Sequence, residues 1–493
     1  MNADKISTER PGWGRAEQAG RFKAIKVEFF LCGFAALRRR FSFFIRVYLR
    51  LSAVAVLLAA AAPAQAILPI QNWQTPNGAR VYFVENHDLP ILDVSVEFPA
   101  GAGYDTAEKA GVAAMTSRLL NAGADGMSED EIARRMADVG AQSGRRFDTD
   151  RAGYALRTLS SARERNQALD VLSRVLRAPA FPQAALEREK VRVIAGLKES
   201  DTRPGTIASR ALFRMVYRDH PYALRASGEV DTIERFTRAD LEAFYRSHYA
   251  AQYAVVAMVG DVTRAQAEAI ADQLTRGLPA SPGAEPSLPP VAGLAAGAVR
   301  TIAHSATQAH ILIGAPGISR DDPDYFPLFV GNYVLGGGGF ASRLIEEVRQ
   351  KRGLAYSAYS YFSPLQREGP FVIGMQTQRD QAGEALEVVR RTLREFLAGG
   401  PTGQELRAAK QNIVGGFPLR IDSNRKIHDY LSVIGFYRLP LSYLEDFAGN
   451  VERVTVSGIR DAFQRRVDPE RMVTVVVGPE PAQSAGAEAG QKP

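Results

Sequence analysis

The chain has 493 residues, of which 46% are hydrophobic, so it can bury a large core, and its length predicts two to four domains. Its net charge of +7 arises in residues 1–66, which hold eleven of the 61 Lys and Arg and four of the 54 Asp and Glu. The rest of the chain carries 50 of each sign, so composition does not support binding to nucleic acid. The single cysteine, Cys32, also lies in residues 1–66, which excludes disulfides, thiolate ligands and a thiol nucleophile from the remainder.

Residues 38–66 are typical of a secretory signal. A basic run at 38–50 precedes an apolar run at 51–62, and Ala-Gln-Ala at 64–66 is a small-residue cleavage site. A retained membrane anchor is the alternative, but the apolar run is shorter than the roughly 20 residues that cross a bilayer. We therefore expect residues 1–66 to be an N-terminal extension and cleaved signal peptide. The mature chain is then expected to be periplasmic, without a stable membrane span.

Between residues 67 and 278, hydrophobic periodicity predicts both strands and helices. Strands at 80–84 and 91–98 are rich in Val, Ile and aromatic residues, and we expect them to pair with each other. Ser128 followed by Glu131 is a capping box that opens a helix. The other predicted strands lie at 154–159 and 253–259, and the other predicted helices at 111–123, 161–176, 183–200, 208–217 and 237–245.

A proline-rich linker is predicted next, because residues 279–290 contain five prolines with Ser, Gly and Ala. Beyond it, the order of elements repeats. Strands are predicted at 310–314, 371–377 and 473–478, and helices at 325–335, 385–397 and 403–416. The ends of the two halves are the most alike: Leu-Glu-Ala-Phe ending at 244 precedes an apolar strand ending at Gly260, and Arg-Asp-Ala-Phe ending at 463 precedes one ending at Gly478.

This repeat favours an internal duplication, and so long a period indicates tandem domains. We expect an α+β fold with two homologous tandem domains, each a mostly antiparallel sheet with helices packed on one face. The expected boundaries are a first domain at 67–278, a linker at 279–297, a second domain at 298–480 and a disordered tail at 481–493.

Two glycine-flanked segments are candidates for function. Apolar residues recur at helical spacing in 111–123, which predicts an amphipathic helix ended by a glycine, with Ala114, Ser117 and Arg118 on its exposed face. The glycine run at 336–339 is not followed by the Lys-Ser/Thr pair of a phosphate-binding loop. We expect it to form a tight turn or a flexible loop that contacts substrate.

Four further motifs are informative: Leu-Gly-Gly-Gly-Gly-Phe-Ala-Ser-Arg-Leu at 335–344, Val-Arg-Gln-Lys-Arg-Gly-Leu-Ala-Tyr at 348–356, His-Pro-Tyr at 220–222 and Val-Gly-Asp at 259–261. Together with the two α+β halves, these motifs resemble the insulinase/pitrilysin-type metallopeptidases. Within that family, the chain resembles the noncatalytic subunits of heterodimeric bacterial and mitochondrial processing-type peptidases.

The resemblance implies a zinc motif, His-x-x-Glu-His, on the helix at 111–123, where this chain departs from the family. Ala114 and Arg118 stand at the two histidine positions and Ser117 at the catalytic base, while Gly196 stands where the third ligand would follow Glu189 by seven residues. Ala and Gly have no donor atom and arginine repels zinc, so we expect these to be degenerate zinc-site positions. The six histidines show no helical pairing that offers another site, so we expect this chain to bind no cofactor and a partner to hold the zinc.

Arg349 and Tyr356 keep the family's spacing of seven residues in the second half. The resemblance implies that such a pair reaches the zinc site and binds the substrate backbone and the developing oxyanion, a role that suits a fixed cation and a phenolic donor. The alternative is that Tyr356 is a core aromatic residue and that Arg349 forms an ion pair with Glu346 or Glu347.

The expected function is that of a zinc-deficient subunit of a periplasmic heterodimeric zinc metalloendopeptidase that acts on peptides or unfolded protein segments. The expected partners are a homologous His-x-x-Glu-His subunit and the peptide substrate. In this reading Arg349 and Tyr356 act in trans, and the chain is not a metallopeptidase alone. The alternative is a noncatalytic peptide-binding or assembly protein of the same fold.

Overall fold

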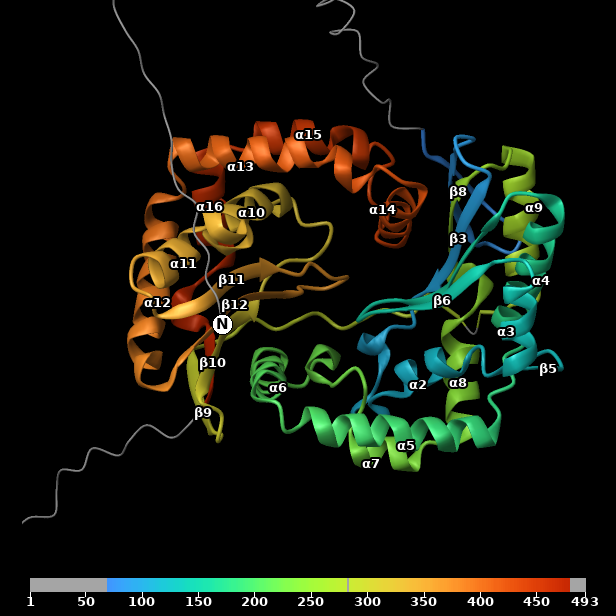
Figure 1. Cartoon of the computed structure of the whole chain (residues 1–493), viewed down its shortest axis with the longest axis horizontal. Coiled ribbons are helices and arrows are strands. Elements are labelled where there is room, and N and C mark those ends of the chain that lie inside the picture. Colours follow the sequence, from blue (N-terminus) through green and yellow to red (C-terminus); the bar gives the residue numbers. More distant parts are fainter. Residues whose placement is uncertain (1–68, 282, 479–493) are drawn as a thin grey trace, which may run out of the picture. The chain divides into compact units, whose positions relative to one another are not determined.

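The computed structural model describes residues 69–281 and 283–478, so the predicted signal peptide and the predicted tail at 481–493 lie outside the described residues. Two halves follow one another, at 71–275 and 298–478, and each contains one large sheet with its helices (Figure 1). We call them the N-terminal half and the C-terminal half. None of the helices in the described ranges is both long enough and apolar enough to cross a membrane.

The sheet of the N-terminal half has a late strand at its centre. In order across the sheet, its strands are β1 (Gln71–Gln74), β2 (Arg80–Glu85), β8 (Val255–Gly260), β3 (Ile91–Phe98), β7 (Ala152–Leu159) and β6 (Gln142–Phe147). The expectation that β2 and β3 pair with each other is wrong, because β8 lies between them, parallel to β2 and antiparallel to β3. All six residues of β8 are buried, and such an apolar strand is stable where both faces of the sheet are covered.

The sheet of the C-terminal half repeats this arrangement. Its strands in order are β11 (Ala355–Phe362), β12 (Pro370–Gln378), β10 (Gln308–Pro316), β13 (Val473–Gly478) and β9 (Ala298–Ala303). The parallel pair β9–β13 corresponds to β2–β8, and the edge strand β11 corresponds to β6. The predicted α+β fold with two similar halves is therefore confirmed. The sequence similarity before Gly260 and Gly478 belongs to the equivalent strands β8 and β13.

Most helices of each half share one hydrophobic core with their own sheet. In the N-terminal half these are α2 (Val112–Leu119), α3 (Glu129–Ala137), α4 (Ala162–Arg177), α5 (Gln183–Ser200), α7 (Val230–Arg235), α8 (Arg238–His248) and α9 (Arg264–Thr275). In the C-terminal half they are α10 (Tyr325–Asn332), α12 (Ala382–Gly399), α13 (Gly403–Gly416), α15 (Tyr443–Arg453) and α16 (Val456–Arg466). Half of the predicted capping box is present on α3: the Ser128 side chain accepts a hydrogen bond from the Glu131 amide, whereas the Glu131 carboxylate binds Arg134 and Arg135.

The second face of each sheet is covered by a helix of the other half. Helix α6 (Pro204–Tyr217) packs on β10 and β13, where Leu212 and Val475 share a buried cluster. Helix α14 (Asn424–Phe436) packs on β2, β3 and β8, where Leu431 and Val259 are buried together (Figure 1). The prediction of helices on one face of each sheet is therefore incomplete, because one helix from each half also packs on the second face of the other half's sheet.

A buried carboxylate ties the two halves together. Asp150, at 0% exposure, accepts hydrogen bonds from the hydroxyls of Tyr222 at 2.7 Å and Tyr437 at 2.8 Å, and from the backbone amide of Gln366 at 2.7 Å. Burial raises the pKa of the Asp150 carboxyl above its usual range. Since Tyr437 and Gln366 belong to the C-terminal half, this polar cluster fixes one half against the other.

Candidate functional site

Helix α2 begins at a sharply constrained turn. Gly111 has a φ of +95°, and a Cβ at this position would lie 2.7 Å from the backbone of Gly228. The buried Asp105 carboxylate accepts hydrogen bonds from the amides of Gly111 at 2.7 Å and Ala113 at 2.9 Å, which satisfies the first amides of the helix. The helix ends at Leu119, before the predicted terminal Gly123, which instead begins the short strand β4 (Gly123–Ala124).

The prediction that α2 exposes Ala114 and Ser117 is wrong. Ala114 is 5% exposed and Ser117 is 0% exposed, and only Arg118 of the three is partly exposed. The helix packs against α8, α5 and the strands β6 and β7, and the Ala114 and Ser117 side chains are buried in this packing. Among the described residues, the Ser117 hydroxyl has no hydrogen-bond partner, and its burial closes this position to solvent.

The positions predicted to correspond to zinc ligands lie on α2 and α5, and the described residues form no metal site there. Glu189 on α5 forms an ion pair with Arg192 at 2.6 Å, and its charge is close enough to affect the pKa of Arg118. A Cβ on Gly196 would meet open space beyond its own stretch of helix, and glycine itself supplies no donor atom to fill that space. The described ranges contain no group of three or more His, Cys, Asp or Glu that could hold a metal ion. The side chains present therefore do not fit zinc.

The structure brings Arg349 and Tyr356 together. The guanidinium carbon of Arg349 lies 4.6 Å from the centroid of the Tyr356 ring and 4.9 Å from the centroid of the Phe340 ring, in the range of cation–π contacts. Glu346 and Glu347 bind Lys351 instead, and no carboxylate of the described residues lies within 4.0 Å of Arg349. The alternative of an ion pair for Arg349 is therefore wrong.

Local irregularities in the backbone position this pair. Tyr356 is the extra residue of a bulge between β11 and β12, and its side chain is 78% exposed, so the alternative of a core aromatic residue is also wrong. Arg349 lies in a π-helical turn at Glu346–Gln350. Both bulges and π-turns re-aim side chains and are often found at functional sites. The pair is consequently presented on the surface of the C-terminal half.

The glycine run forms a tight turn that packs against β11. A π-helical turn at Tyr333–Gly337 continues α10, so the predicted single helix at 325–335 changes its winding after Asn332. A Cβ on Gly336 would lie 2.4 Å from both the backbone nitrogen and the hydroxyl of Ser360, which excludes any larger residue. Phe340 follows the glycine run, is 69% exposed and contacts Arg349. Phe340 is therefore a functional candidate that the sequence did not predict, although its position directly after the glycine run could have suggested it.

Comparison with known sequences identifies both halves. Residues 80–229 match the family model described as insulinase (peptidase family M16), and residues 235–413 match the model described as the peptidase M16 inactive domain. An uncharacterized zinc protease of Streptomyces coelicolor is 29% identical over 318 residues, which are 63% of this chain and 69% of that protein. A protein of Helicobacter pylori named non-peptidase homolog YmxG is 26% identical over 404 residues, 80% of this chain and 91% of that protein.

Solved structures agree with these matches. The crystal structure of a peptidase M16 inactive domain from Pseudomonas fluorescens is 39% identical, with a TM-score of 0.81, over 85% of this chain and 99% of that one. The periplasmic protease PqqL of Escherichia coli shares the fold at 16% identity, with a TM-score of 0.73, over 84% of this chain and 46% of that one. The chain therefore belongs to the insulinase family, peptidase family M16.

Proposed function

We propose that this chain is the zinc-deficient subunit of a periplasmic, heterodimeric zinc metalloendopeptidase that cleaves peptides or unfolded protein segments. The single observation that carries the proposal is the contact of Arg349 with the exposed Tyr356 in a chain whose described residues include no group of three side chains that could hold zinc. A protein that served only as a scaffold would have no need of a half-buried arginine held beside an exposed phenol.

In the proposed pair, the partner subunit carries His-x-x-Glu-His and supplies the zinc and the general base. This chain supplies the Arg349 guanidinium and the Tyr356 hydroxyl to the partner's site. These donors would stabilise the negative charge that develops on the carbonyl oxygen when water attacks the peptide bond. Their stacked geometry supports the role, because a cation held by aromatic rings keeps its N–H groups free for substrate.

The second proposed contribution is a substrate-binding wall, by which we mean the exposed sheet edges formed by β6 and β11. The strands β6 and β11 occupy the edges of their sheets, and each pairs with one neighbour in the described sheets. An extended peptide can add to such an edge through backbone hydrogen bonds. The proposed periplasmic location rests on the secretory pattern in the sequence at 38–66.

The test is to purify the exported chain alone and together with a homologous His-x-x-Glu-His subunit, encoded by a neighbouring gene, and to measure association, zinc content and cleavage of unfolded peptides. We expect no activity from this chain alone, and activity that is abolished by EDTA from the pair. Stoichiometric zinc with EDTA-sensitive activity in the isolated chain would refute the proposal. A pair that associates but is no more active than the zinc subunit alone would favour the noncatalytic assembly role.

A further inference from the structure

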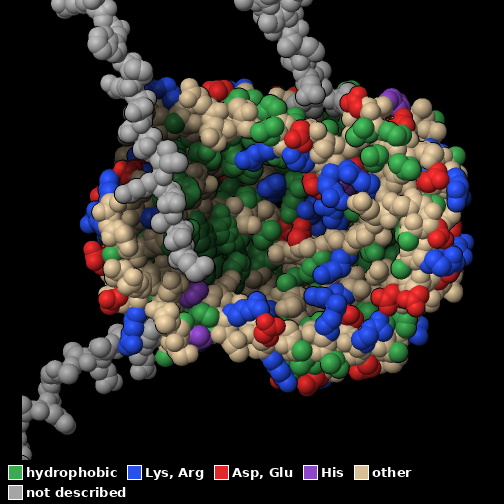
Figure 2. All heavy atoms as spheres, in the orientation of Figure 1, with side chains coloured by type: hydrophobic (Ala, Val, Ile, Leu, Met, Phe, Trp, Pro, Cys, Tyr) green, Lys and Arg blue, Asp and Glu red, His purple; other side chains and the backbone are tan. Residues whose placement is uncertain are grey.

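The edge strand β6 is exposed and basic. Its sequence is Gln-Ser-Gly-Arg-Arg-Phe, and residues 142–145 are exposed along the outer edge of the N-terminal sheet. The molecule is hollowed on the face shown in Figure 2, where Lys and Arg side chains gather on the side of β6 and α14. The free edge of β6 therefore borders a cationic surface.

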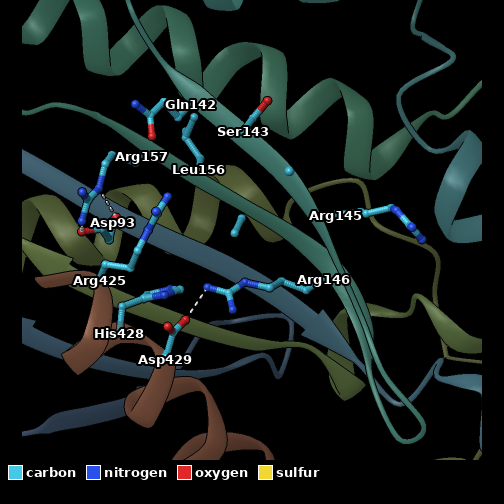
Figure 3. Close-up of a pocket in the computed structure, with 12 residues that line it drawn as sticks. Asp93, Gln142, Ser143, Arg145, Arg146, Leu156, Arg157, Arg425, His428 and Asp429 are labelled. Atoms are coloured by element: carbon cyan, nitrogen blue, oxygen red, sulfur yellow. Dashed lines mark hydrogen bonds and ion pairs between the residues drawn. The ribbon is translucent and has the colours of Figure 1, made fainter. Parts of the chain in front are cut away.

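One face of β6 forms a pocket with α14 (Figure 3). The pocket has a volume of about 380 Å³, enough for one or two side chains of a peptide. Its two carboxylates already have partners: Asp429 binds Arg146 at 2.6 Å, and Asp93 binds Arg157 through both oxygens at 2.7 and 2.8 Å. Arg425 also lines the pocket, and no carboxylate of the described residues lies within 4.0 Å of it.

A buried histidine in the same pocket lacks a partner. His428 is 2% exposed, and its Nε2 atom makes no hydrogen bond to any described residue. Burial lowers the pKa of His428, so the ring favours its neutral form and adds no positive charge to the pocket. Its Nε2 atom is closed to solvent, so the free guanidinium of Arg425 is the group that an anionic oxygen in the pocket would meet.

Unpaired cations also lie on the opposite face of β6. Arg145 also borders the pocket, but Figure 3 shows its side chain extending away from Arg146 and Arg425. Its charge contributes, after burial, to the lowered pKa of Arg118 on α2. Within the described ranges, neither Arg145 nor Arg118 has a carboxylate within 4.0 Å. The nearby Glu189 is bound to Arg192 instead. Arg118, at a degenerate zinc-site position, thus forms part of a cationic surface.

We propose that β6 binds an extended acidic peptide segment, with carboxylate side chains on both faces of the added strand. Side chains alternate between the two faces of a strand, so one set of Asp or Glu residues would face Arg425 and the other set would face Arg145 and Arg118. This inference rests on the proposed function, because it names the substrate class of the same peptide-binding wall. A strand edge fits a peptide backbone better than a nucleic acid, which has no matching donors and acceptors along its chain.

The proposal can be tested on the purified chain without its partner. A fluorescent peptide of about ten residues, the length of a long strand, carries Glu at most positions, and its matched control carries Gln at the same positions. Binding is measured by fluorescence anisotropy for the wild type, for the double variant Arg145→Gln/Arg425→Gln, and for Arg300→Gln. Arg300 is an exposed arginine of β9 in the other half, so its variant shows the effect of losing one positive charge away from β6.

We expect the wild type to bind the Glu peptide at least about fivefold more tightly than the Gln peptide, and the preference to weaken as salt is raised. The double variant should lose this preference, whereas Arg300→Gln should keep it. Equal binding of the two peptides would overturn the proposal. So would displacement of the labelled Glu peptide by single-stranded DNA at a lower concentration than the unlabelled Glu peptide requires. Because no partner or cleavage is involved, a failure here is distinct from a failure of the proposed proteolytic role.

Discussion

Arg349 holds its guanidinium carbon 4.6 Å from the ring centroid of Tyr356 without a carboxylate of the described residues within ion-pair distance. A salt bridge would occupy the N–H groups of the arginine and neutralise its charge. Stacking on Tyr356 and Phe340 restricts the side chain and leaves those groups available. The exposed Tyr356 ring presents its hydroxyl at the same surface.

Replacing Tyr356 by phenylalanine in the active pair should lower turnover by about 100-fold, the usual effect of losing one oxyanion donor. Association with the partner should be unchanged, because the aromatic ring and its contact with Arg349 remain. Turnover is measured by steady-state cleavage of an unfolded peptide, and association by sedimentation. Tyr359→Phe is the matched control, since Tyr359 lies on the same strand and is 43% exposed. Equal turnover for the two variants would argue against a catalytic Tyr356.

Zinc should not bind to the isolated chain. Untagged protein that has been incubated with excess zinc and desalted is expected to contain less than about 0.1 zinc per chain, because a protein zinc site needs at least three convergent ligands. Arg118→His adds a single donor beside Ala114 and Gly196, so its zinc content should stay at the same level. Content is measured by atomic emission. A value near one zinc per wild-type chain would reveal a ligand set outside the degenerate positions.

Asp105 should make stability depend on pH in a defined direction. Burial raises its pKa to about 7, so the folded state favours the protonated carboxyl. This contribution is fully present below the unfolded pKa of about 4 and is lost as the pH rises through about 7, at about 1.4 kcal/mol per pH unit inside that window.

The measurement compares urea unfolding of the wild type and Asp105→Asn at about pH 5 and about pH 8. The asparagine does not titrate, so the stability of the wild type relative to the variant should fall between the two pH values. Other titrating groups cancel in this difference. A constant difference between the two proteins would mean that Asp105 keeps the same protonation state folded and unfolded.

The sequence predicted elements that carry their own periodic pattern. The helices predicted at 183–200 and 403–416 match α5 and α13. The sequence similarity before Gly260 and Gly478 identified β8 and β13 as equivalent strands. The edge strand β6 was missed because Gln-Ser-Gly-Arg-Arg-Phe has no apolar alternation, and only pairing with β7 makes it a strand.

The features that depend on tertiary contacts could not be read from local patterns. The insertion of β8 between β2 and β3 is a long-range pairing. The packing of α6 and α14 on the sheet of the other half also depends on contacts between residues that are distant in sequence. At the candidate site, the spacing of Arg349 and Tyr356 was informative. Their contact with Phe340 and the bulge at Tyr356 required the fold. The burial of Ser117 likewise follows from neighbours that are distant in sequence.

The junction between the halves can be weakened by removing a single hydroxyl. Tyr437→Phe takes one of three donors from the buried Asp150 carboxyl and should lower the free energy of unfolding by about 1.5–3 kcal/mol, the range for hydrogen bonds to charged groups. Tyr430→Phe on α14 is the control, because the Tyr430 hydroxyl makes no hydrogen bond to the described residues, and its effect should stay within about 0.5 kcal/mol. Both are measured by urea unfolding. Since the two variants remove the same atom from neighbouring positions, equal effects would mean that the Asp150 cluster does not stabilise the junction.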